Sequence, residues 1–144
     1  MKVTTVAAIA VLAMSAGVSQ SASAGEYTIL IYETQADLDL RDRQTPESAE
    51  YWGAFREFAG ILQASGMMRD GAPLRDPVTA HTIEAGKPPA KGAYANSGLR
   101  LGGYFRIEAP SLNVAMNLAS QVPAIARGGA VEVRETYPAP AMSQ

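Results

Sequence analysis

Alternating and continuous runs of apolar residues predict several strands. Glu26–Tyr32 ("EYTILIY") is rich in β-branched and aromatic residues, and both of its faces are largely apolar, so we expect both to be covered. Residues 101–109 ("LGGYFRIEA") and 127–135 ("RGGAVEVRE") predict two further strands. Met67–Met68 is expected to begin a short strand. Thr79–Ala85 can form another, which "GKPP" turns.

A long amphipathic helix is predicted after residue 45. Thr45 suits the N-cap, Pro46 the first helical position, and Gly66 a left-handed stop. Apolar residues then recur at three- and four-residue spacing, which predicts one buried stripe. The stripe consists of Trp52, Phe55, Phe58 or Ala59, and Leu62.

Residues 110–123 ("PSLNVAMNLASQVP") predict a second helix, which Pro123 is expected to close. Its buried stripe would be Leu112, Ala115 or Met116, and Ala119. Residues 33–44 carry many charges and are expected to form a polar connection.

This order of elements predicts an α+β fold of the ferredoxin-like, split β-α-β type, an antiparallel sheet with two helices on one face. The helix-covered face would hold Ile29, Ile31, Phe105, Ile107, Val131 and Val133. The other face would hold Leu30, Tyr32, Tyr104, Arg106, Glu132 and Arg134. A second copy, packed sheet against sheet, is expected to cover this mixed face and to leave a pocket between the two chains.

Residues 1–24 differ in composition from the rest and are predicted to be a cleavable signal peptide. Lys2 is their one charge, Val6–Val18 is largely apolar, and small residues stand at Ala22 and Ala24. The apolar run is shorter than the ~20 residues of a membrane span. We therefore expect cleavage after Ala24, a periplasmic or secreted protein, and no stable membrane insertion.

Length and charge narrow the classes of function for the remaining chain. We expect one domain over residues 25–137 and a loose tail over 138–144. Without Lys2 the chain has 11 basic and 14 acidic residues, and no basic cluster, which disfavours nucleic acid as a partner. It has no Cys and one His, which argues against a transition-metal site, and no cofactor is expected.

Several segments, in this order and spacing, resemble the YCII-related domain family, in its Asp-Gly-Pro-Phe branch. They are "YTILIYE", "LQASGMM", "TAHTIEAGKPP", "LGGYFRIE" and "PAIARGGAVEVRE". The resemblance covers nearly the whole chain after residue 24. It implies a ferredoxin-like fold paired into a dimeric α+β barrel, and cofactor-free acid–base chemistry by a His-Asp pair where members are catalytic.

The four residues that name the branch fall on Lys91, Gly92, Ala93 and Tyr94. Lysine replaces the aspartate, and an ammonium with a pKa near 10.4 cannot accept a proton at neutral pH. A role that needs this acid is lost or moved to another residue.

The candidate catalytic residues are His81, the one histidine, and Asp70 or Asp76, either of which could orient it. The simpler interpretation of His81 is an exposed strand residue.

Arginines and tyrosines are the candidate pocket residues. Arg100, Arg106 and Arg134 could bind a carboxylate or phosphate by a bidentate fork, or they could pair with neighbouring acids such as Glu108 and Glu132. Tyr32, Tyr94 and Tyr104 could line a pocket or pack at the dimer seam.

Three functions follow from this reading: binding of a small organic molecule at a dimer-interface pocket, a cofactor-free lyase or isomerase, or a structural, partner-binding homodimer. Whether the protein is an enzyme is left open by the sequence.

Overall fold

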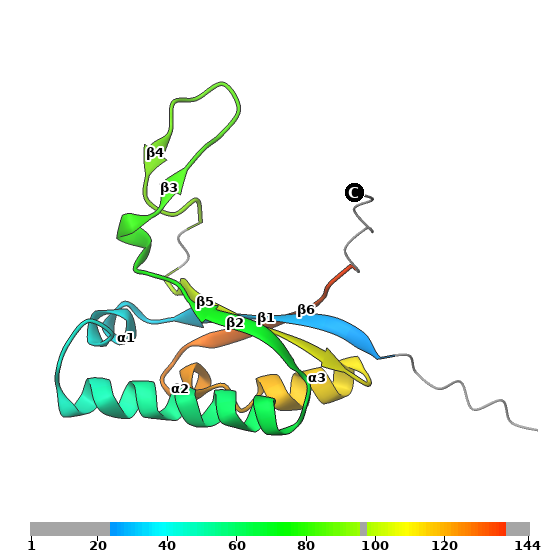
Figure 1. The fold of residues 1–144 in the computed structure, drawn as a ribbon. Coiled ribbons are helices and arrows are strands. Elements are labelled where there is room, and N and C mark those ends of the chain that lie inside the picture. The colour runs from blue at the N-terminus through cyan, green and yellow to red at the C-terminus, as the bar shows by residue number, and fades with distance from the viewer. Residues whose placement is uncertain (1–23, 96–97, 138–144) are drawn as a thin grey trace, which may run out of the picture.

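A four-stranded antiparallel sheet forms the centre of the computed structural model, which describes residues 24–95 and 98–137 (Figure 1). The strand order is β2-β5-β1-β6. The strands are β1 (Gly25–Glu33), β2 (Met68–Pro73), β5 (Arg100–Ala109) and β6 (Ala130–Glu135). The three long strands predicted from the sequence are confirmed, and the short strand expected to begin at Met67–Met68 is β2, which starts at Met68.

Three helices lie along one face of this sheet (Figure 1). They are α2 (Pro46–Ala64), α3 (Leu112–Ala119) and α4 (Pro123–Ala126). Thr45 caps α2 by accepting a hydrogen bond from the Ser48 amide at 3.3 Å, and Gly66 takes a positive φ of 73° after its end, as predicted.

The core lies between these helices and the sheet. Alternate residues of β1 point into it, so that Tyr27, Ile29, Ile31 and Glu33 are all buried. Phe58 and Leu62 of α2 pack against them. The predicted α+β class and antiparallel sheet are confirmed, and the arrangement is compatible with a ferredoxin-like fold.

Residues 33–44, which were expected to form a polar connection, are more ordered than the sequence analysis indicated. They contain a further helix, α1 (Gln35–Leu40), at one end of the sheet (Figure 1). The Thr34 side chain caps it by accepting a hydrogen bond from the Asp37 amide at 3.2 Å. Leu38 of α1 is buried, and burial of this apolar side chain stabilises the helix despite the many charges around it.

Three details of the predicted helices are wrong. Leu112, which was predicted on the buried stripe of α3, is 48% exposed. In α2, Tyr51 is buried and its neighbour Trp52 is only half-buried, so the buried stripe is rotated by one residue at this end. Pro123 does not close α3, which ends at Ala119; it begins α4, where its missing N–H leaves no hydrogen bond unmade.

The segment between β2 and β5 forms a projection, here called the arm (residues 77–95). It contains a single 3₁₀ turn, η1 (Pro77–Thr79), and a hairpin of β3 (His81–Thr82) and β4 (Ala90–Lys91). The predicted strand over residues 79–85 is therefore reduced to two residues. Figure 1 shows the hairpin rising from one end of the sheet, on the side opposite the helices.

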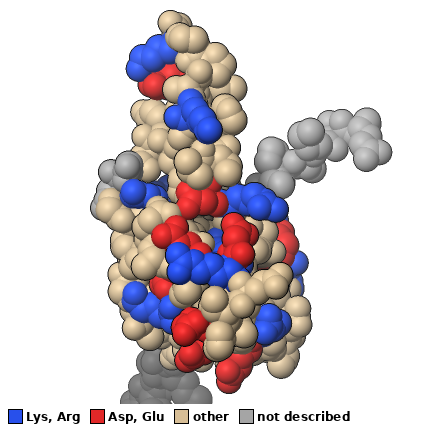
Figure 2. Space-filling model, turned by 90° about the vertical axis from the view of Figure 1, so that its left-hand side faces the viewer, with Lys and Arg blue, Asp and Glu red and all other residues tan. Residues whose placement is uncertain are grey.

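The sheet face opposite the helices carries half-buried residues such as Leu30, Tyr32 and Tyr104. Within the described ranges no helix covers it (Figure 1). In Figure 2, acidic and basic side chains are intermixed over the α1 end of the molecule, so this end presents no surface of a single charge.

No helix within residues 24–95 and 98–137 has the length and apolarity needed to cross a bilayer. The predicted signal peptide, apart from Ala24, and the predicted tail lie outside the described residues.

Candidate binding site

A cavity of about 230 Å³ lies between α2 and the β2–β5 side of the sheet. α2 contributes one wall and the strands contribute the other. The exposed residues Arg56, Gly71 and Pro73 mark its mouth, while Glu33 and Tyr51, both fully buried, mark its inner end. The cavity therefore runs from solvent beside the edge strand β2 to a buried polar group.

The walls of the cavity are largely apolar and aromatic. Tyr51, Trp52, Phe55 and Ala59 line it from α2, and Phe105 lines it from β5. The Tyr51 ring packs against Trp52 and Phe55, with centroid distances of 5.1 and 5.0 Å. These ring contacts fix the wall in one arrangement, so the cavity is formed before any ligand enters.

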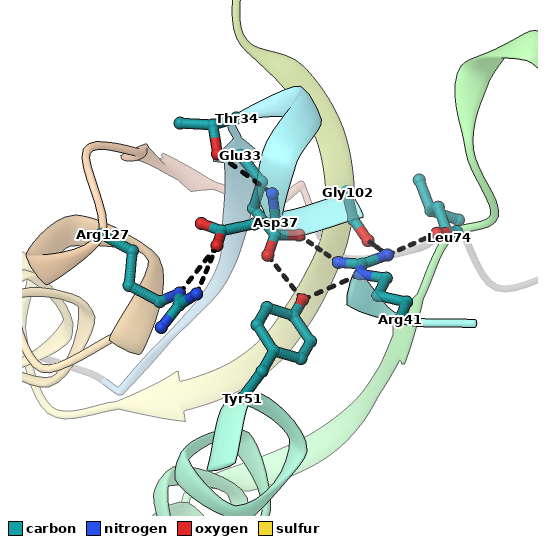
Figure 3. Close-up of polar contacts among 8 residues, drawn as sticks. All are labelled: Glu33, Thr34, Asp37, Arg41, Tyr51, Leu74, Gly102 and Arg127. Carbon is teal, nitrogen blue, oxygen red and sulfur yellow. Dashed lines mark hydrogen bonds and ion pairs between the residues drawn. The ribbon is translucent and has the colours of Figure 1, made fainter. Parts of the chain in front are cut away.

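Glu33, Arg41 and Tyr51 form the inner polar end (Figure 3). The Tyr51 hydroxyl donates to Glu33 Oε1 at 2.6 Å and accepts from Arg41 Nε at 2.8 Å. Arg41 Nη2 forms an ion pair with Glu33 Oε2. Each side chain thus contacts the other two, and both carboxylate oxygens of Glu33 have a donor.

Arg41 also joins separate parts of the backbone. Its Nη1 donates to the carbonyls of Leu74 at 2.6 Å and Gly102 at 2.9 Å, while its own carbonyl accepts from the Trp52 indole at 3.2 Å. The guanidinium lies 5.6 Å from the Tyr51 ring centroid and 5.7 Å from that of Trp52. Arg41 therefore holds α1, α2 and the β2–β5 edge together around the cavity.

Gly102 makes room for this ion pair. A Cβ added there would overlap the Glu33 carboxylate and come within 2.9 Å of Arg41 Nη2. The absence of a side chain at this position of β5 is therefore a requirement of the Glu33–Arg41 contact.

A second ion pair supports the first from the other side of Tyr51. Arg127 Nη2 lies 2.6 Å from Asp37 Oδ1, and its guanidinium lies 5.7 Å from the Tyr51 ring centroid (Figure 3). Asp37 is almost fully buried, and its Oδ2 has no hydrogen-bond partner within the described part of the chain. This pair fixes the start of α1 against the turn that follows α4.

Burial controls the protonation of the inner end. Desolvation raises the pKa of Glu33 above its usual 4.5, and the Tyr51 hydrogen bond and the Arg41 charge only partly offset this. Desolvation and the hydrogen bond to Glu33 raise the pKa of the Tyr51 phenol. The phenol therefore stays protonated at neutral pH and remains a donor to Glu33.

The polar groups at the inner end are engaged with one another. The Tyr51 hydroxyl both donates and accepts, and each Glu33 oxygen accepts. A ligand that reached this end would find few free donors or acceptors, and breaking the existing bonds would cost free energy. The geometry therefore favours binding of an apolar group over proton transfer by Glu33.

The structure does not bring the predicted catalytic residues together. His81 lies exposed on the arm, in register with Lys91. Asp70 binds Arg106 at 2.8 Å, and Asp76 caps η1 and accepts from Gln35 at 2.7 Å. No contact between His81 and either aspartate is present in the described residues, so the acid–base role stays a prediction.

Three of the predicted pocket residues form ion pairs or hydrogen bonds on the open sheet face. Tyr32 and Arg134 both contact Glu132, at 3.4 and 2.5 Å. Arg106 pairs with Asp70 and, at 3.3 Å, with Glu26. The alternative of pairing with neighbouring acids is confirmed for Arg134. Arg106 also pairs with acids, although its partners are not Glu108 or Glu132.

The other three predicted pocket residues are spread over the molecule. Tyr104 pairs with Leu30 on the open sheet face, and its position in β5 also borders the cavity. Tyr94 is 78% exposed on the arm, and Arg100 lies where the arm returns to the sheet, close enough to Asp76 for their charges to interact. Any common pocket for these residues would need a second chain.

The sequence analysis missed the residues of the inner end. Glu33 continues the inward alternation of Ile29 and Ile31, and this period of two would have identified it as a buried acid. Thr34, three residues before Asp37, is a helix N-cap signal that would have revealed α1 and so the position of Arg41.

Within the described residues, no group of three His, Asp or Glu side chains is placed so that it could hold a metal ion. No family model matches the chain, and a search of curated proteins finds no similar sequence. The resemblance to YCII-related domains therefore remains a prediction.

Proposed function

We propose that this protein binds a small, largely apolar organic molecule in the cavity between α2 and β2. The observation that supports this most is a preformed aromatic cavity whose buried polar end is already hydrogen-bonded internally. A dry cavity of about 150 Å³ is known to bind benzene. A volume of about 230 Å³ suits a ligand with one or two rings.

Calorimetric titration with indole tests this proposal. Ala59→Leu would add side-chain volume inside the cavity, whereas Ala64→Leu adds the same atoms at an exposed position of α2. We expect binding to the wild type and to Ala64→Leu, and an affinity at least about tenfold lower for Ala59→Leu. Absence of binding by the wild type, or equal affinities of the two variants, would refute the proposal.

We also propose that a second copy of the chain covers the open sheet face, in the manner of a ferredoxin-like dimeric barrel. The strand order and the half-buried side chains of Leu30, Tyr32 and Tyr104 support this. Sedimentation velocity at micromolar concentration should show a dimer that Leu30→Asp dissociates. A monomer under all conditions would contradict it.

We propose, finally, that the chain is exported and cut after Ala24, on the pattern of its first 24 residues. Mass spectrometry of the protein from the producing cell should find Gly25 at the N-terminus. An intact Met1 would exclude cleavage.

A further inference from the structure

The charged side chains that line the cavity differ in whether they have interaction partners. Three charged residues line it: Glu33, Arg41 and Arg56. The first two pair with each other at the inner end. Arg56 is exposed, and it has no hydrogen-bond, ion-pair or ring partner within residues 24–95 and 98–137. It is the charge at the cavity that is left for a ligand.

The position of Arg56 on α2 directs it to the mouth of the cavity. Trp52, Arg56 and Ala59 are spaced by four and three residues, so they lie on one face of the helix, and all three line the cavity. The residues three and four positions from Arg56 along α2 include no acid. An intrahelical partner for its guanidinium is therefore not available.

Ligand orientation follows from the two ends of the cavity. A negative group at the inner end would meet the Glu33 carboxylate and a hydroxyl that already donates to it. At the mouth the same group would meet an unpaired guanidinium, which binds carboxylates through two parallel N–H···O bonds. The apolar part of such a ligand would enter first and its charge would remain near solvent.

We propose that the ligand is an organic carboxylate, with an apolar ring inside the cavity and its carboxylate on Arg56. This inference rests on the proposed function and adds the chemical class of the ligand. It assigns Arg56 as the residue that selects an acid over a neutral molecule of the same shape.

Indole-3-carboxylate and indole-3-carboxamide are suitable probes because they differ in charge and little in size. We expect calorimetry on the full chain, at low salt, to show the carboxylate binding about tenfold more tightly than the amide. Arg56→Gln should remove this preference, because it weakens carboxylate binding about tenfold more than amide binding. Arg43→Gln, the loss of an exposed arginine that does not line the cavity, should retain it.

The outcomes separate this inference from the proposed function. Equal binding of both probes to the wild type would overturn the carboxylate assignment and leave cavity binding intact. A preference that survives in Arg56→Gln would overturn the role of Arg56. No binding of either probe would overturn both proposals. Unfolding curves of each variant should match the wild type, because both substitutions are at exposed positions.

Discussion

The body of the protein (the four-stranded sheet with α1 to α4) and the arm obtain their structure in different ways. Every buried residue within the described ranges lies in the body, where Ile29 and Leu62 are fully covered. In the arm no residue is buried, and Val78, Ile83 and Tyr94 are 63–78% exposed. The arm keeps its shape through turns and a few backbone hydrogen bonds, such as Gly92 N–H to the Ala80 carbonyl at 2.7 Å.

This difference indicates where stability and recognition reside. Burial of apolar surface is the main favourable term in folding, so the body carries nearly all of the free energy of folding. A two-stranded hairpin is marginal by itself in water. The arm is therefore free to change in sequence, and its apolar side chains are available for contact with another molecule.

The largest effect is expected from breaking the buried ion pair of the body. Arg41→Met would remove the charge with which the fully buried Glu33 is paired, and Tyr51 would be its one remaining donor among the residues described. Loss of one partner of a buried pair costs about 3–5 kcal/mol, and urea unfolding should show a loss of this size. The double variant with Glu33→Gln removes both charges and should be more stable than Arg41→Met alone. If the second substitution adds a further loss, the pair is not the cause.

Two isoleucines give the most direct comparison of body and arm. Ile29→Ala removes a fully buried side chain and should lower the free energy of unfolding by about 2–5 kcal/mol. Ile83→Ala makes the same chemical change in the arm and should stay within about 0.5 kcal/mol of the wild type. Urea midpoints measure both. A loss near that of Ile29→Ala at Ile83 would mean that the arm is covered by another chain.

The smallest expected effect is on the pH dependence of stability, which also differs between the body and the base of the arm. Burial raises the pKa of Glu33, so the folded state holds its proton more tightly than the unfolded chain does. This contribution is present in full below about pH 4.5 and is lost as the pH rises through the folded pKa. Asp76, at the base of the arm, has a pKa lowered by its hydrogen bond from the Val78 amide, and its contribution is lost at lower pH instead.

Between pH 5 and 7.5, stability should therefore fall less steeply for Glu33→Gln than for the wild type. The slope of the free energy of unfolding against pH is informative even if this variant is less stable. Arg41 remains charged throughout the interval, so it adds no pH dependence of its own. Glu57→Gln, which removes an exposed carboxylate from α2, is the control. Parallel curves for Glu33→Gln and the wild type would contradict the raised pKa.

Much of the body could be predicted because its pattern is local and periodic. Alternation in β1 and β5 and the capped start of α2 each depend on neighbouring residues alone, and these elements were correctly placed. α1 was missed because it is six residues long and rich in acids, so its charge concealed the cap at Thr34.

The cavity could not be predicted in the same way. It depends on the space left between α2 and β2 once they pack in the fold. The residue pattern of each element gives no information about that space. The sequence analysis also selected polar residues of the open sheet face, such as Arg106, as candidate pocket residues. The amino-acid sequence alone does not show which charges have partners. Arg106 has two, and Arg56, which was not considered, has none within the described ranges.

The bare α-carbon of Gly102 has a consequence for how this sequence can diverge. Any side chain at that position would exclude the Glu33–Arg41 contact, so Gly102 can be replaced only together with Glu33 or Arg41. In relatives of this protein, a larger residue at the position of Gly102 should occur together with loss of the acid, the base or both. The residues at these three positions would then show which relatives have kept the polar inner end of the cavity.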